Sequence, residues 1–234
     1  MINIQNIKFG YDSHQAVLDD FSLDFGQGGV YGLLGKNGTG KSTLLYLMMG
    51  LLRPQKGSIT IDGTSASLRT PEVLSEMFLV PEEYDLPPIS LRRYVCAIKP
   101  FYPRFSEETL AQCLQNFDMT SDINLGRLSM GQKKKVYMSV AIASNTRHLL
   151  MDEPTNGLDI LSKSQFRKAV IDSMTDERIV IVSTHQVHDV ERLLDHVCII
   201  DRNQVLLNEP LVEKEQAINL EELFIKTVEQ KQLI

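Results

Sequence analysis

The run Gly35–Ser42 reads Gly-Lys-Asn-Gly-Thr-Gly-Lys-Ser and contains three glycines, with a lysine and a serine at its end. This run fits the spacing G-x-x-x-x-G-K-[ST]. The glycines allow backbone angles that a side chain would forbid, so consecutive N–H groups can turn inward on the oxygens of a polyphosphate. In such a loop Lys41 brings a cation to the β- and γ-phosphates, and the hydroxyl of Ser42 is a ligand for Mg²⁺.

The residues on either side of this run give it the context that a phosphate-binding loop requires. Residues 30–34 are a short apolar run, typical of a buried strand, and residues 43–49 have a helical pattern that Gly50 ends. The N-terminus of that helix adds unpaired N–H donors and a partial positive charge. The alternative is an ordinary glycine-rich turn, but the loop and its flanking elements together favour a nucleotide site.

Two adjacent carboxylates, Asp152 and Glu153, follow the apolar residues 149–151. Acids at the end of a buried strand are costly unless a cation or a proton uses them. Because neighbouring strand residues point to opposite sides, one acid can hold Mg²⁺ while the other acts on a water molecule. The alternative is a solvated turn after a strand, which the phosphate loop in the same chain disfavours.

A histidine, His185, follows the apolar strand predicted over 179–182, at the carboxyl end, where open α/β sheets bind their ligands. A lone histidine is more often a packing or capping residue, so by itself His185 is a weak indication. The set His185, His188 and His196 lacks a cysteine or carboxylate companion at ligand spacing. We therefore expect no structural metal site.

The segment Leu128–Gln132 begins another predicted helix. Ser129 and Gln132 have the S-x-x-Q spacing of a capping box, so the simplest interpretation is a well-built helix start. The three lysines at 133–135, however, place cations where the helix dipole disfavours them. They are explained if this helix end faces an anion, although a solvated surface remains the alternative.

The segments between these groups alternate between strand and helix patterns, which predicts an α/β fold with a mainly parallel sheet covered on both sides. Together with the phosphate loop, this predicts a P-loop NTPase core. Five prolines between positions 81 and 103 mark a change of composition, and we expect an inserted helical subdomain at about 84–128. The expected strands are 2–9, a pair within 16–25, 30–34, 58–63, 78–80, 147–152, 178–183, 196–201 and 204–207; the expected helices are 43–49, a short one from Pro71, 90–98, 107–117, 130–144, 160–173, 186–194 and a polar tail helix at 211–232.

Length and composition exclude several other classes of protein. The 234 residues suffice for one sizeable α/β domain with a subdomain, but not for two nucleotide-binding units. A net charge of −6 argues against a nucleic-acid binder. Cys96, Cys113 and Cys198 have no C-x-x-C spacing, which favours a reducing compartment and buried thiols. We find no signal peptide and no apolar run of about 18 residues, so we expect any membrane function to depend on a partner.

Taken together, these groups resemble the ATP-binding subunit of an ABC transporter over about residues 1–208. Gly35–Ser42 matches the Walker A loop, and Leu149–Glu153, headed by His148, matches Walker B. Leu128–Gln132 is similar to the LSGGQ signature, and Asn156–Asp159 resembles the D-loop. Within the family, the run Phe101–Phe105 and the lysine-rich start of the signature helix are similar to single-domain subunits of bacterial exporters. The resemblance implies an N-terminal antiparallel β subdomain beside the core, and we treat residues 209–234 as a C-terminal helical tail.

The resemblance also implies a head-to-tail dimer, a homodimer or a heterodimer of nucleotide-binding subunits, that holds two ATP molecules between the subunits. Glu153 would polarise the attacking water, and His185 would contact the γ-phosphate. Ser129 and Gly131 of the opposite subunit would close the site, so the cationic helix start would face the partner's ATP. The catalytic residues implied are Lys41, Glu82, Glu153 and His185; the Mg²⁺ ligands are Ser42, Glu82 and Asp152; the nucleotide contacts are Tyr11 (on adenine), Gly35, Lys36, Asn37, Gly38, Thr39, Gly40, Lys41, Ser42, Thr43, Ser129, Gly131, Gln132 and Asp159.

Two residues depart from the family's pattern. Glu82 stands where the family has the glutamine of its glutamine loop, and it adds negative charge beside the phosphates. Met130 replaces the first glycine of the signature, which adds bulk and removes backbone freedom. We expect an altered hydrolysis rate or coupling from the first change and a weaker closed dimer from the second.

The function implied is an ATPase at the cytoplasmic face of the cell membrane that powers a transmembrane permease on a separate chain, with membrane contact only through that permease. Two alternatives stay open on the sequence. The chain could be a soluble ABC-type ATPase that acts as an assembly or regulatory factor without a permease. It could also be a nucleotide-binding switch that hardly hydrolyses ATP, which Glu82 and Met130 motivate and the intact Glu153 and His185 oppose.

Overall fold

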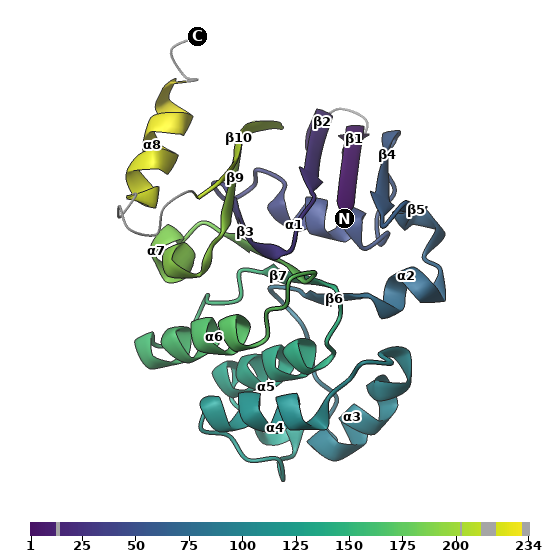
Figure 1. Ribbon diagram of the computed structural model, residues 1–234, viewed down its shortest axis with the longest axis vertical. Coiled ribbons are helices and arrows are strands. Elements are labelled where there is room, and N and C mark those ends of the chain that lie inside the picture. The colour runs from purple at the N-terminus through teal and green to yellow at the C-terminus, as the bar shows by residue number, and fades with distance from the viewer. Residues whose placement is uncertain (13–14, 202, 212–218, 231–234) are drawn as a thin grey trace.

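The computed structural model describes residues 1–12, 15–201, 203–211 and 219–230, and its main sheet has the order β10-β9-β3-β8-β7-β6 (Figure 1). Neighbouring strands from β9 to β6 are parallel, and β10 is antiparallel to β9. The predicted mainly parallel sheet is therefore confirmed. Its strands are β3 (Gly29–Leu34), β6 (Met77–Val80), β7 (His148–Asp152), β8 (Ile179–Thr184), β9 (His196–Asp201) and β10 (Gln204–Pro210).

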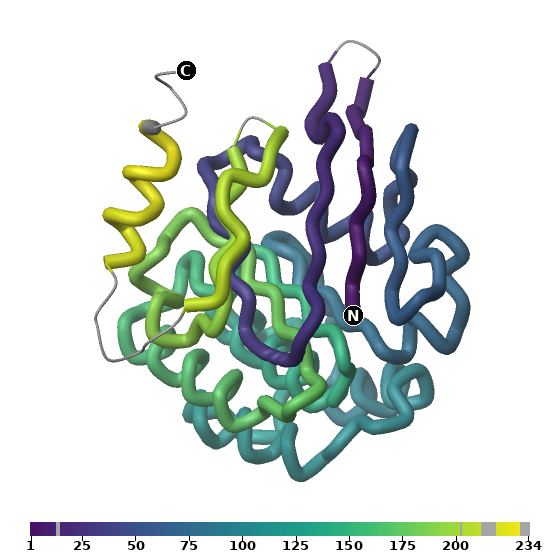
Figure 2. The backbone as a smooth tube through the Cα atoms, turned by 45° about the horizontal axis from the view of Figure 1, so that its top comes forward, coloured from purple at the N-terminus to yellow at the C-terminus, as the bar shows by residue number. Residues whose placement is uncertain are grey.

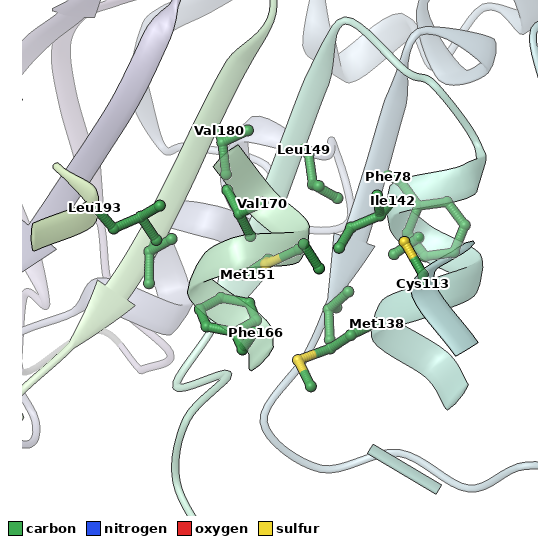
Figure 3. Close-up of a cluster of buried hydrophobic side chains, with 14 of the residues drawn as sticks. Phe78, Cys113, Met138, Ile142, Leu149, Met151, Phe166, Val170, Val180 and Leu193 are labelled. Carbon is green, nitrogen blue, oxygen red and sulfur yellow. The ribbon is translucent and has the colours of Figure 1, made fainter. Parts of the chain in front are cut away.

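Both faces of this sheet are buried, and successive side chains of a strand enter different cores. In β8, Ile179 and Ile181 belong to one hydrophobic cluster, whereas Val180 and Val182 belong to the other. This follows from the alternation of side chains in a strand, and it explains why the central strands are apolar throughout. Figure 3 shows side chains of β6, β7 and β8 directed toward helices on one of the two faces.

A second sheet, with the order β2-β1-β4-β5, is antiparallel and lies beside the N-terminal part of the core. It consists of β1 (Ile2–Phe9), β2 (Leu18–Phe25), β4 (Lys56–Ile61) and β5 (Thr64–Ser65). The strand pair that we expected within 16–25 is wrong, because β2 is one strand. Asp20 has φ +50° within it, and the amide of Asn6 donates to its carboxylate over 2.9 Å. The register shifts in β1 and β2 show that this polar stretch is a bulge and not a turn.

The helices lie on both sides of the main sheet. Helix α1 (Lys41–Met48) packs between the two sheets, since its apolar side chains share a cluster with β1 and β2. The other side carries α5 (Met130–Ala143) and α6 (Ile160–Asp172), with α7 (Val187–Val190) near the end of the sheet. The short α2 (Pro71–Ser75) precedes β6.

The predicted inserted helices are α3 (Leu91–Ile98) and α4 (Glu107–Asn116), which pack beyond α5 at the bottom of Figure 1. The hydroxyls of Ser90 and Ser106 accept hydrogen bonds from the first turns of these helices, as N-caps do. Glu107 and Glu108 lie in the first turn of α4, where the helix dipole favours acids.

The tail helix is shorter than expected. It is α8 (Leu220–Gln230), and residues 212–218, 231 and 232 of the expected helix lie outside the described residues. Glu209 and Pro210, the first residues of the expected tail, belong to β10. Leu220 and Val228 are buried in a core cluster, so α8 packs on the domain (Figure 2). The division at residue 208 stays a prediction.

Two expectations from composition concern cysteines and membrane spans. All three cysteines are free; Cys113 and Cys198 are buried, but Cys96 is exposed, contrary to the expectation of buried thiols. Within the described ranges, no helix combines the length and the apolar character that crossing a bilayer requires.

Candidate functional site

The glycine-rich loop joins β3 to α1 and has the predicted strand–loop–helix context. Gly38 and Gly40 have φ of +82° and +96°, which side chains rarely adopt. Gly35 does not have a positive φ; a Cβ there would lie 2.7 Å from the carbonyl oxygen of Ile200 and from Oγ1 of Thr39. The first glycine is therefore required by close packing, and the other two by backbone angle.

The side chain of Lys41 is folded back onto this loop. Its ammonium donates to the carbonyl oxygens of Gly35 (2.7 Å) and Lys36 (3.2 Å) and lies 3.7 Å from Oε1 of Glu153. Burial lowers the pKa of Lys41, while the neighbouring carboxylates of Glu153 and Asp152 act in the opposite direction. The chain thus holds a desolvated ammonium at the mouth of the loop, where an anion would find a cation with few competing waters.

Asp152 ends β7 and is 1% exposed. Burial raises the pKa of its carboxyl, hydrogen bonds from Ser183 and Ser42 oppose this, and the charges of Glu153 and Glu82 reinforce it. A carboxylate beside a serine hydroxyl is an oxygen donor set that suits Mg²⁺. Among the described residues no group of three or more His, Cys, Asp and Glu could hold a metal by itself, so a Mg²⁺ ion here would need further oxygens, such as those of phosphates.

Glu153 follows the strand in a left-handed backbone conformation, with φ +44°. Its Oε1 accepts from the backbone N–H of His185 (3.1 Å) and faces Nδ1 of the same residue (2.8 Å), and its Oε2 accepts from the hydroxyl of Thr184 (2.9 Å). Asp152 and Glu153 thus have separate partners, as their division of roles requires. Sequence reasoning missed the hydroxyls of Ser183 and Thr184, although two polar residues at the end of an apolar strand are a signal.

Nine of the expected residues line a pocket of about 320 Å³ between the loop and the end of β7. Its lining does not include five other expected residues, which are Gly35, Lys36, Thr39, Asp152 and His185. Glu82 reaches it although the residue is largely exposed, and the side-chain amide of Asn156 donates to its Oε1 over 3.0 Å. Val17 and Asn156 are contacts that sequence reasoning missed. The pocket is lined by Tyr11, Val17, Asn37, Gly38, Gly40, Lys41, Ser42, Thr43, Glu82 and Glu153.

Tyr11 lies at the open side of this pocket and is 66% exposed. Its hydroxyl is 3.1 Å from Oγ1 of Thr43, and its ring packs edge-on against Phe9 with the centroids 5.1 Å apart. These two contacts position a ring that is otherwise largely exposed, so it can stack on a nucleobase.

Ser129, Gly131 and Gln132 do not line this pocket. They form the predicted capping box at the start of α5, in which the N–H of Gln132 donates to Ser129 Oγ (3.3 Å) and the N–H of Ser129 donates to Gln132 Oε1 (3.0 Å). Met130 is 70% exposed beside them. Asp159 is also occupied locally, because it caps α6 by accepting from the N–H and hydroxyl of Ser162. One chain therefore presents a pocket and, separately, an exposed helix start.

The three lysines at the start of α5 do not all face outward, as the prediction of a cationic helix start required. Lys133 lies 3.4 Å from the carboxylate of Asp85, whereas Lys134 is buried and donates to the backbone carbonyls of Glu153 and Asn156 in its own chain. The prediction that the whole cationic start faces a partner's ATP is therefore wrong for Lys134. Consecutive helical residues are about 100° apart around the axis, so three adjacent lysines cannot share one environment.

Comparisons with known proteins agree with this geometry. The sequence model described as "ABC transporter" matches residues 18–156. The chain is 30% identical over 216 residues to the high-affinity zinc uptake system ATP-binding protein ZnuC of Bacillus subtilis, covering 87% of this chain and 92% of that protein. It is 27% identical over 227 residues to the lantibiotic transport ATP-binding protein SrtF of Streptococcus pyogenes, covering 96% of each. A solved structure of the ATP-binding subunit of an ABC transporter is similar in fold, with a TM-score of 0.85, 24% identity, and coverage of 97% of this chain and 99% of that one.

Proposed function

The chain belongs to the ABC transporter family as an ATP-binding subunit that hydrolyses ATP, and from this premise we propose that it powers a transmembrane permease carried on a separate chain. Relatives that are ATP-binding proteins of transport and uptake systems support the permease, and the incomplete pocket supports a dimer of the ATP-binding subunits. The phosphate loop and Glu153 lie together, whereas the exposed start of α5 does not line the same pocket. A second subunit placed head to tail would bring its Ser129 and Gly131 to the nucleotide.

In this proposal the groups of the pocket divide the work of phosphoryl transfer, which depends mainly on positioning and charge stabilisation. Lys41 leaves the loop carbonyls and binds the β- and γ-phosphates. Glu153 accepts a hydrogen bond from the attacking water, and His185, held against Glu153, contacts the γ-phosphate. The backbone N–H groups of Gly38–Lys41 and the helix start of α1 bind the remaining phosphate oxygens.

Ser42 and Asp152 would hold Mg²⁺, and Glu82 lies close enough to the pocket to reach the ion or the water. The ion would neutralise negative charge on the phosphates. This role fits the raised pKa of Asp152, because an incoming cation would favour its charged form. Glu82 instead keeps its hydrogen bond from Asn156 when no cation is near.

A pull-down of the full-length tagged chain from detergent-solubilised membranes tests the permease. We expect a polytopic membrane protein to co-purify and to stay bound in ATP and in ADP. Soluble partners alone would instead favour the alternative of an assembly or regulatory factor. Because the relatives include a zinc uptake system, export is the finer part of our proposal, and transport assays in right-side-out and everted vesicles decide it. The proposed location, the cytoplasmic face of the cell membrane, follows from the permease.

Tyr11 gives a test of adenine recognition. Replacing Tyr11 with alanine should weaken ATP binding about tenfold, because stacking of a base on an aromatic ring contributes about 1–3 kcal/mol. Tyr11→Phe keeps the ring and loses only the contact with Thr43, so we expect a change below about threefold by the same reasoning. Equilibrium binding of ATP and of inorganic triphosphate should be compared, since only ATP should respond. Equal losses for both ligands would contradict stacking at Tyr11.

A further inference from the structure

Lys134 is a buried lysine without a carboxylate partner. The residue is 8% exposed, and among the described residues no carboxylate oxygen lies within 4.0 Å of its ammonium. Instead the ammonium donates to two backbone carbonyls, those of Glu153 and Asn156, each over 2.8 Å. An ammonium is costly to bury. The adjacent Lys133 instead pairs with the exposed carboxylate of Asp85, so burial is not forced on a lysine at this end of the helix.

The two carbonyls mark the ends of the turn that follows Walker B. Within this turn the N–H of Asn156 donates to the carbonyl of Glu153 over 3.2 Å, and Glu153 has φ +44°. A non-glycine residue in this left-handed region is strained and persists only where its surroundings hold it. The bonds from Lys134 supply such a restraint, because they fix both ends of the turn to α5.

One end of this turn, Glu153, lines the pocket, and the other, Asn156, contacts Glu82, which also lines it. The carboxylate of Glu153 faces His185, and the amide of Asn156 holds Glu82. The carbonyls that Lys134 binds thus belong to Glu153 itself and to Asn156, which holds the carboxylate of Glu82. The nearby charges of Glu82, Glu153 and Asp152 also favour the protonated form of Lys134, against the effect of burial, which lowers its pKa.

We propose that Lys134 is a positioning residue, which fixes the main chain of Glu153 and Asn156 to the signature helix and so couples the closure of one site to the catalytic glutamate of the other. This inference rests on the proposed function. In the head-to-tail dimer, Ser129 and Gly131 would contact the ATP of the opposite site, whereas Lys134, about 8 Å along the same helix from Ser129, holds Glu153 of its own site. Movement of α5 on closure would therefore be transmitted through the ammonium.

The test compares three variants of the full-length chain. Lys134→Met keeps the length of the side chain and removes the donors; we expect kcat to fall at least tenfold, while the Kd for ATP changes less than threefold. Lys134→Arg keeps several N–H donors and should restore kcat to within about threefold of the parent. Lys168→Met removes an equal charge from an exposed position of α6 and should leave kcat unchanged.

Hydrogen exchange of the backbone amides of Asn156 and Leu158 provides a readout that needs no turnover. We expect both amides to exchange faster in Lys134→Met than in the parent or in Lys168→Met. If no form, the parent included, hydrolysed ATP, the proposed function would be contradicted. Faster exchange in Lys134→Met would in that case still support the contact between Lys134 and the turn. An active parent with unchanged kcat and exchange in Lys134→Met would overturn the inference, and so would unfolding or an equal loss of ATP affinity, since these assign Lys134 a structural role only.

Discussion

The Glu153→Gln variant is expected to bind ATP and to hydrolyse it at least 100-fold more slowly than the parent. A positioned general base contributes about 10²–10⁴-fold to a rate, and glutamine cannot take up a proton. The amide fits the same contacts, because its oxygen can accept from the N–H of His185 and its nitrogen can donate to Thr184. The loss should therefore fall on kcat and not on the fold.

Two measurements separate this result from a structural defect. Single-turnover hydrolysis gives the chemical step, and size-exclusion chromatography in ATP should show more dimer for Glu153→Gln than for the parent, because the nucleotide persists. Glu108→Gln, an exposed acid on α4, is the control and should match the parent in both. If Glu153→Gln turned over ATP at the parental rate, the water-activating role would pass to another group, with Glu82 the first to test.

The sequence alone located the parts of the site that depend on local pattern. Gly35–Ser42 and its flanks predicted a strand, a loop and a helix, and all three are present. Ser129 and Gln132 predicted a capping box, and its two hydrogen bonds form. In these cases the interaction lies within a few residues of the chain, so spacing is sufficient to predict it.

The failures concern contacts between distant segments. Lys134 and Asn156 are 22 residues apart. The lysine donates to backbone carbonyls of the turn after β7 only because α5 packs next to that turn. The bulge at Asp20 likewise depends on Asn6 of the neighbouring strand. In both places a polar side chain forms a hydrogen bond with a residue that is distant in the sequence, and no local pattern identifies that residue. The charge of Lys134 therefore predicted a helix end that faces an anion or solvent, and the polar residues around Asp20 predicted a turn.

Replacing Lys41 with methionine is expected to raise the Kd for ATP at least 100-fold. Hydrogen bonds to charged groups contribute about 1.5–3 kcal/mol each, and two bonds to phosphate oxygens account for about 3 kcal/mol or more, which is a factor above 100. Equilibrium binding of ATP measures the change. Lys56→Met, on an exposed position of β4, is the control and should bind like the parent; a Kd for Lys41→Met within threefold of the parent would mean that the loop N–H groups hold the phosphates without the lysine.

The effects of Lys41 and Glu153 should not be additive, because their charged groups lie 3.7 Å apart in the free protein. In the parent, ATP competes with Glu153 for the ammonium, so Glu153→Gln should tighten ATP binding severalfold by removing the competing charge. In the Lys41→Met background there is no ammonium to release. Glu153→Gln should then change the Kd for ATP only by removing the repulsion between the Glu153 carboxylate and the phosphates. A double-mutant cycle on the Kd for ATP measures this coupling. Equal effects of Glu153→Gln in both backgrounds would show that Lys41 does not exchange Glu153 for phosphate when the nucleotide binds.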